Sequence, residues 1–151
     1  MSGIKTPSKK ERTPYYRRDQ RDGITAPDLT KPCTYAEHVV HARGRRTAYT
    51  SVSLEAQKIE RFGPSLYELR REELDRSPHE LVEHDTLIEV LRQIATTGEK
   101  AERARALQAQ RYARSSREGL VAWKFDVAGV DRKDLISWAR RQIQPFFQKL
   151  S

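Results

Sequence analysis

The sequence has a single cysteine, no long apolar run and no recognisable export signal. Because Cys33 is the only cysteine among 151 residues, no disulfide within the chain and no zinc site made of several cysteines can form. No apolar stretch approaches the roughly 18 residues that a membrane-spanning helix needs. The segment from Met1 to Pro14 is polar and basic, without the apolar core of a secretory signal peptide. We therefore expect no membrane span, and a protein that is cytoplasmic or is exported without a cleavable signal peptide.

Positive charge is present in excess. Lysine and arginine together number 29 against 21 aspartates and glutamates, which gives a formal net charge of +8. Such a surplus favours an anionic partner, such as nucleic acid, an acidic protein surface or a phosphate-bearing ligand. The simpler interpretation is an arginine-rich surface that only keeps a small protein in solution, and composition alone leaves both open.

Length and local composition indicate one folded domain. A chain of 151 residues can bury one substantial core but not two. Residues 1–13 contain almost no apolar side chain and include a run of lysines, which predicts a disordered basic tail. We expect residues 14–151 to form a single α+β domain, with a small mixed or antiparallel sheet, flanking helices and a largely helical C-terminal part.

Short strands and helices alternate in the first half of this domain. Thr34 and Glu37 have the spacing of a capping box, which predicts the start of a helix. The segment 46–53 is rich in Thr, Tyr and Val, which is typical of a strand. The expected elements are a strand opening at 14–18, a helix from Thr34 to Gly44, a strand at 46–53, a helix at 54–62 and a strand at 65–69.

Longer helices are expected in the second half. Apolar residues recur at helical spacing from Thr86 to Gly98, and 99–118 has a strong helix composition. Alternating apolar residues predict a half-buried strand at 120–127. A last helix is expected after Asp131, kinked or shortened by Pro145. One face of that helix is expected to carry five apolar residues: Ile136, Ala139, Ile143, Phe147 and Leu150.

Three short segments carry residue types that suit a nucleotide ligand. They are the run Tyr16-Arg17-Arg18-Asp19-Gln20-Arg21, the hydroxyl-rich strand Tyr49-Thr50-Ser51-Val52-Ser53, and the acidic loop Ser77-Pro78-His79-Glu80-Leu81-Val82-Glu83-His84-Asp85. An arginine forms two parallel hydrogen bonds to a phosphate more readily than a lysine does. A carboxylate near a ribose stabilises the positive charge that develops when a glycosidic bond breaks. Each segment alone is also typical of a solvated strand end or a helix N-cap.

In this order the segments resemble the Arg, Ser-Thr-Ser and Glu signature of the ADP-ribosyltransferases, particularly the enzymes of cholera and pertussis type. The first segment looks like the family's Tyr-Arg-x-Asp-x-Arg motif, the second like its aromatic-x-Ser-Thr-Ser strand, and the third like the Ser-Pro-His loop before the catalytic glutamate. The resemblance covers residues 14–90, which would form the NAD-binding part, and leaves out the basic helix, strand and last helix at 99–151. It implies an ADP-ribosyltransferase-like fold in compact, divergent form.

The resemblance also implies an activity and a site. The activity is that of a toxin- or effector-like mono-ADP-ribosyltransferase, which uses NAD as substrate, needs no metal and modifies a macromolecular acceptor, protein or nucleic acid. The implied catalytic residues are Glu83, Arg17 and Ser51. The residues expected to contact NAD are Arg17, Asp19, Arg21, Thr50, Ser51, Tyr49 and Tyr67, with the two tyrosines beside the nicotinamide ring.

The sequence departs from the family at the acidic position. Leu81 stands two residues before Glu83, where arginine-modifying members carry a second glutamate. If the acidic pair is instead Glu83 and Asp85, the second acid is of another type. The acceptor therefore stays open, and so does a non-catalytic version of the fold.

A second hypothesis rests on the arginine-rich helix, which would belong to a non-enzymatic nucleic-acid- or ribosome-binding protein. Its expected contacts are Arg103, Arg105, Arg111, Arg114 and Arg117. A cognate inhibitor or a secretion chaperone is a further candidate partner for this helix. His38 and His41 lie three residues apart, but no matching carboxylate motif follows, so we expect surface or capping histidines and no metal site.

Overall fold

A computed structural model describes residues 12–41 and 47–151, without the side chain of His41. Most of the expected N-terminal tail therefore lies outside the described residues. The same is true of the expected helix end at Gly44 and of the first residue of the expected strand at 46–53. Among the described residues, no helix combines the length and the apolar character that crossing a membrane requires.

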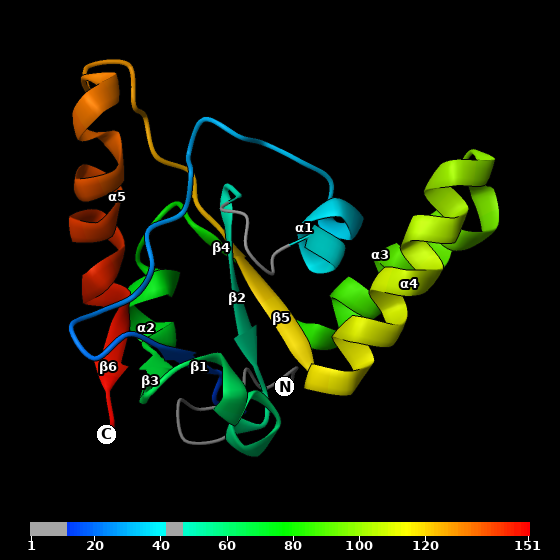
Figure 1. The fold of residues 1–151 in the computed structure, drawn as a ribbon, viewed down its shortest axis with the longest axis horizontal. Helices are drawn as coiled ribbons and strands as arrows, with labels where there is room; N and C mark the ends of the chain where they lie inside the picture. Colours follow the sequence, from blue (N-terminus) through cyan, green and yellow to red (C-terminus); the bar gives the residue numbers. More distant parts are fainter. Residues whose placement is uncertain (1–11, 42–46) are drawn as a thin grey trace, which may run out of the picture.

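The described strands form one antiparallel sheet with helices around it, so the α+β class is confirmed (Figure 1). The strand order is β4-β5-β2-β1-β3-β6. The strands are β1 (Tyr16–Asp19), β2 (Tyr49–Ser53), β3 (Ser65–Leu69), β4 (Glu80–Val82), β5 (Glu118–Ala122) and β6 (Phe147–Lys149).

The helices gather on two sides of the sheet. Helices α3 and α4 form a hairpin on one side, next to α1, whereas α5 lies on the far side beside β6 (Figure 1). The helices are α1 (Tyr35–His41), α2 (Arg71–Asp75), α3 (His84–Thr97), α4 (Lys100–Ser116) and α5 (Leu135–Ile143), with the 3-10 helices η2 (Ala56–Phe62), η3 (Arg132–Asp134) and η4 (Gln144–Phe146). The capping box before α1 is confirmed, because Glu37 N donates to Thr34 Oγ1 at 3.1 Å and Thr34 N donates to Glu37 Oε1 at 3.3 Å.

Two apolar clusters, one on each face of the sheet, hold these layers together. Neighbouring residues of β5 divide between them, since side chains alternate along a strand: Leu120 packs with α1, α3 and α4, and Val121 packs on the opposite face. The cluster of Leu120 also contains Val39, Leu87 and Leu91. The glutamate that begins β5 therefore projects from the same face as Leu120, toward α1 and α4.

The C-terminal part differs from the sequence prediction. The expected helix running to Leu150 ends at Ile143, because the ring of Pro145 cannot continue it. The chain then forms β6, which pairs with β3 and buries Phe147 in the core, whereas Ile136 and Leu150 stay exposed. The strand expected at 120–127 ends at Ala122.

The sheet opens between β1 and β2. In the described chain a single residue pair, Tyr16 opposite Ser53, joins these strands. By contrast β1 pairs with β3 at four positions and β2 with β5 at five. Beyond Tyr16 the two strands therefore separate, and their backbone groups face a gap that side chains must fill.

Candidate active site

A pocket of about 610 Å³ lies at the point where β1 and β2 separate. Its walls come from both of these strands, from α1 and η2, and from the last turn of α4 with the first residue of β5. Small-molecule sites commonly have volumes of about 300–1,000 Å³. The pocket is therefore large enough for a ligand of nucleotide size.

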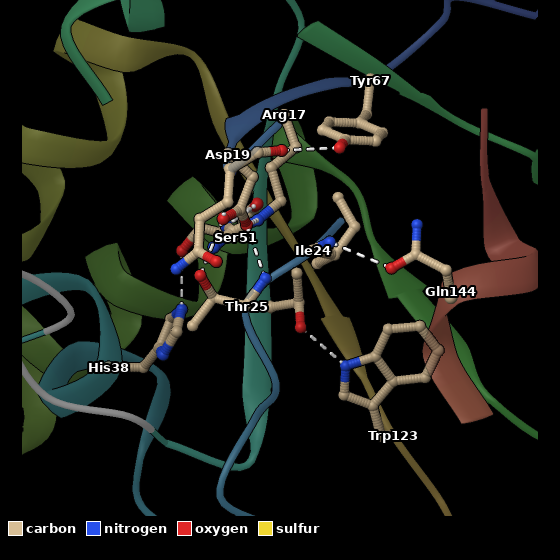
Figure 2. Close-up of polar contacts among 11 residues, drawn as sticks. Arg17, Asp19, Ile24, Thr25, His38, Ser51, Tyr67, Trp123 and Gln144 are labelled. Carbon is tan, nitrogen blue, oxygen red and sulfur yellow. Dashed lines mark hydrogen bonds and ion pairs between the residues drawn. The ribbon is translucent and has the colours of Figure 1, made fainter. Parts of the chain in front are cut away.

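Arg17 bridges the gap between the two strands. Its Nη1 donates to the backbone oxygen of Ser51 at 2.8 Å, and its Nε donates to Asp19 Oδ2 at 2.7 Å (Figure 2). Its Nη2 makes no hydrogen bond to another described residue, and the arginine lines the pocket. The arginine thus replaces the missing backbone pairing of β1 with β2.

Asp19 fixes the orientation of Arg17. Besides Arg17 Nε, its carboxylate accepts from Thr25 N at 2.9 Å, Thr25 Oγ1 at 2.7 Å and Gln20 N at 2.8 Å. Burial opposes the charge, but Arg17 and Thr25 outweigh it, so the pKa of Asp19 is lowered from 3.8. These bonds occupy the carboxylate, so Asp19 holds Arg17 in position; Asp19 also lines the pocket, and its expected contact with NAD stays a prediction.

A continuous chain of hydrogen bonds runs along one wall of the pocket. Ser51 Oγ donates to Glu118 Oε2 at 2.8 Å and lies 2.7 Å from His38 Nε2. The hydroxyl of Thr47 lies against the other ring nitrogen, His38 Nδ1. Because the one hydroxyl proton of Ser51 goes to Glu118, His38 donates through Nε2–H and accepts from Thr47 through Nδ1. His38 is only 3 % exposed, so the expectation of a surface or capping histidine was wrong.

Burial shifts the pKa values of both ionisable members of this chain. Desolvation raises the pKa of Glu118 to about 7, although the Ser51 hydrogen bond and the charge of Arg17 act in the opposite direction. Desolvation, helped by the charge of Arg17, lowers the pKa of His38 to about 4. Above neutral pH the pocket therefore holds a carboxylate at Glu118 beside an uncharged imidazole.

Contacts behind the strand hold the backbone of Glu118 in place. His84 Nδ1 lies 2.8 Å from the backbone oxygen of Glu118, and His84 N donates to the hydroxyl of Tyr15 at 2.7 Å. The next residue must be Gly119, because an added Cβ would lie 2.8 Å from the Tyr15 ring and 2.9 Å from the Val82 backbone oxygen. Tyr15 and His84 thus hold the backbone at the start of β5 in position.

The sequence placed the catalytic carboxylate at Glu83, and the structure separates this residue from Arg17 and Ser51. Glu83 precedes α3, its side chain is 53 % exposed, and its Oε1 lies 3.0 Å from Arg71 Nη2. It follows the edge strand β4, which β5 separates from β2, so it does not line the pocket. The glutamate that lines the pocket with Arg17 and Ser51 is Glu118.

The remaining residues expected to contact NAD divide into two groups. Tyr49 and Thr50 line the pocket, although the hydroxyl of Thr50 is taken by Trp123 Nε1 at 2.8 Å. Tyr67 is buried in the core with its hydroxyl donating to the Gln20 backbone oxygen at 2.6 Å (Figure 2). Arg21 is exposed, and neither residue lines the pocket. A ligand in this pocket would therefore contact neither of these two residues.

The arginines of the basic helix are exposed, as a nucleic-acid-binding surface would require. None of them forms an ion pair with another residue in the described part of the chain; they are Arg103, Arg105, Arg111, Arg114 and Arg117. Within residues 12–41 and 47–151, no group of three or more His, Cys, Asp or Glu side chains is arranged to hold a metal ion.

Comparison of the chain with protein-family models, with curated proteins and with solved structures gives no match. Function is therefore inferred from the geometry of the pocket.

Proposed function

We propose that this protein is an NAD-dependent mono-ADP-ribosyltransferase of toxin or effector type, with a divergent ADP-ribosyltransferase-like fold. The observation that carries the proposal is the meeting of Arg17, Ser51 and Glu118, from three strands, in one pocket. Two of these residues belong to the segments that resemble the family. The third supplies the glutamate that the resemblance requires, from β5 instead of from the loop before α3.

The arrangement suits the binding of NAD. The free Nη2 of Arg17 can donate to a pyrophosphate or ribose oxygen, and the bonds to Asp19 and Ser51 hold the guanidinium in one orientation. Tyr49 provides an aromatic wall, which itself packs edge-on against His38 with 5.4 Å between ring centroids. Arg17 and Tyr49 thus give a charged and an aromatic contact within the same pocket.

The chemistry assigned to Glu118 is charge stabilisation. As the C–N bond between ribose and nicotinamide breaks, its electron pair leaves with the nicotinamide, which departs uncharged, and positive charge develops on the ribose. A carboxylate there stabilises this charge or accepts a hydrogen bond from the 2′-hydroxyl. His38, with its pKa of about 4, stays neutral and adds no opposing charge. The acceptor then attacks the ribose carbon and loses a proton.

NAD titration of a matched pair of variants tests the role of Arg17 in NAD binding. Arg17→Lys keeps the charge but cannot donate to Asp19, Ser51 and a phosphate together, and we expect about tenfold weaker NAD binding. Arg21→Lys, from the same segment but outside the pocket, should bind as the wild type does. Wild-type protein that neither binds nor consumes NAD would overturn the proposal.

A further inference from the structure

Two exposed aromatic rings lie at the edge of the same pocket. Among the described residues with exposed large apolar side chains, the two aromatic ones are Phe62, 45 % exposed, and Tyr112, 40 % exposed. They come from η2 and α4, yet both line this pocket. The guanidinium of Arg61 lies 4.4 Å from the centre of the Phe62 ring. Flat rings beside arginines are the usual platform for an unstacked nucleic-acid base.

The adjoining helix carries charge of one sign. Residues 103–117 contain five arginines and no aspartate or glutamate. Some arginines elsewhere are held by carboxylates, Arg71 by Glu83 at 3.0 Å and Arg92 by Glu89 at 2.6 Å, whereas others, such as Arg61 and Arg132, have no ion pair among the described residues. The five arginines of α4 and its C-cap have no such partner among the described residues. A ligand with repeated negative charges matches this surface.

Helical geometry connects one of these arginines, Arg105, to the pocket. Residues three, four and seven positions apart share a helix face, so Arg105, Gln108 and Tyr112 form one stripe along α4. Gln108 Nε2 donates to the hydroxyl of Tyr112 at 3.1 Å, and the stripe reaches the pocket at Tyr112 and Ser115. Arg117 follows directly and precedes Glu118. Of the five arginines, Arg105 therefore shares the stripe of Tyr112, whereas Arg103 and Arg114 lie on the opposite side of the helix.

We propose that this surface binds single-stranded nucleic acid as the acceptor, with phosphates at Arg61 and Arg105 and an unstacked base against Phe62 and Tyr112. An acidic peptide would match the charge but would leave the two rings unused, which favours the nucleic acid. The transfer step rests on the proposed function: a base nitrogen bonds to the ribose carbon, nicotinamide leaves with the electron pair of the broken bond, and the proton on that nitrogen passes to water.

Binding can be measured without NAD. In fluorescence anisotropy with the full chain, a labelled single-stranded DNA of about 20 nucleotides should bind more tightly than the blunt duplex of the same sequence. The logarithm of the affinity should fall with the logarithm of salt concentration, by about 0.7 for each phosphate contacted. Equal affinity for the duplex, or no binding at low salt, would overturn the proposal.

Matched variants assign the binding to this surface. Tyr112→Ala should weaken single-strand binding about tenfold, whereas Tyr112→Phe keeps the ring and should not. The double variant Arg61→Gln with Arg105→Gln should reduce the salt slope by about 1.4. Arg141→Gln, on α5 at the far side of the molecule, removes a charge without this effect (Figure 1). Circular dichroism melting confirms that each variant is folded.

Competition and turnover separate the remaining outcomes. Polyglutamate that displaces the oligonucleotide equally well at matched charge would identify an acidic protein as the partner and overturn the proposal. NAD turnover without oligonucleotide binding would overturn the proposal of a nucleic-acid acceptor but leave the proposed transferase activity intact. Oligonucleotide binding that depends on Tyr112, without NAD turnover, would support the proposed nucleic-acid-binding surface and overturn the proposed transferase activity.

Discussion

Ser51 Oγ donates a hydrogen bond to Glu118 Oε2 at 2.8 Å, although 67 positions separate the two residues in the chain. The register of β2 with β5 explains the contact, because Ser53 lies opposite Glu118 and Ser51 is its diagonal neighbour on the same face. The backbone oxygen of the same serine accepts from Arg17 Nη1. Ser51 is therefore the residue through which the cation of β1 and the carboxylate of β5 meet.

This relationship predicts the pH dependence of the reaction. The pKa of Glu118 is about 7 and the ionised form is the active one, so NAD consumption should rise with pH through about 7. Ser51→Ala removes a hydrogen bond that favours the ionised form, so the midpoint should move to higher pH. The check is the rate of nicotinamide release against pH for both proteins. An identical midpoint in the variant would show that Ser51 does not tune Glu118.

Stability should depend on pH through two opposing groups. The folded pKa of Glu118, about 7, lies above its ordinary 4.5, so its contribution is complete below 4.5 and is lost as pH rises to 7. The folded pKa of His38, about 4, lies below its ordinary 6.5, so its contribution is complete above 6.5 and is lost as pH falls to 4. Each changes the free energy of unfolding by about 1.4 kcal/mol per pH unit, and between 4.5 and 6.5 they cancel.

Substituting Glu118 or His38 alone separates their two opposing contributions to stability. Relative to the wild type, Glu118→Gln should gain stability as pH rises from 4.5 to 6.5, because only the His38 contribution remains. His38→Asn should lose stability over the same range. Urea unfolding at several pH values measures both differences. Parallel stability curves for the two variants would contradict the assigned shifts.

The sequence predicted the first three strands because each has its own local signal. The hydroxyl- and tyrosine-rich run at Tyr49–Ser53 and the segment Ser65–Leu69, both expected as strands, are strands in the structure. The capping box at Thr34 likewise begins a helix. Such local signals depend on neighbouring residues and require no knowledge of the chain elsewhere.

Glu118 was missed for a physical reason. The helix before it ends at Ser116, and the capping residue Arg117 adopts a left-handed conformation with φ 51° where a glycine is usual, so no stop signal was visible. The expected helix therefore ran through residue 118 and hid the start of β5. The pairing of β5 with β2 is long-range and carries no local mark. A glutamate followed by Gly119 and a run of apolar residues was the available signal.

His84 should act as a positioning residue for Glu118. His84→Ala removes the contact between Nδ1 and the Glu118 backbone oxygen, and we expect a lower kcat with little change in KM for NAD. His84→Asn retains a donor and should restore part of the rate. Steady-state kinetics of both variants check this, with urea unfolding as the measure of stability. If His84→Asn does not restore kcat, and kcat falls only in proportion to the fraction of folded protein, His84 has a purely structural role.

The most direct test of the account compares two glutamates in one assay, the release of nicotinamide from labelled NAD. Glu118→Gln removes the carboxylate from the pocket and should lower the rate about 100- to 1,000-fold. Glu83→Gln changes an exposed carboxylate that contacts Arg71 and should leave the rate near that of the wild type. The opposite result, a rate lost with Glu83 and kept without Glu118, would contradict the account.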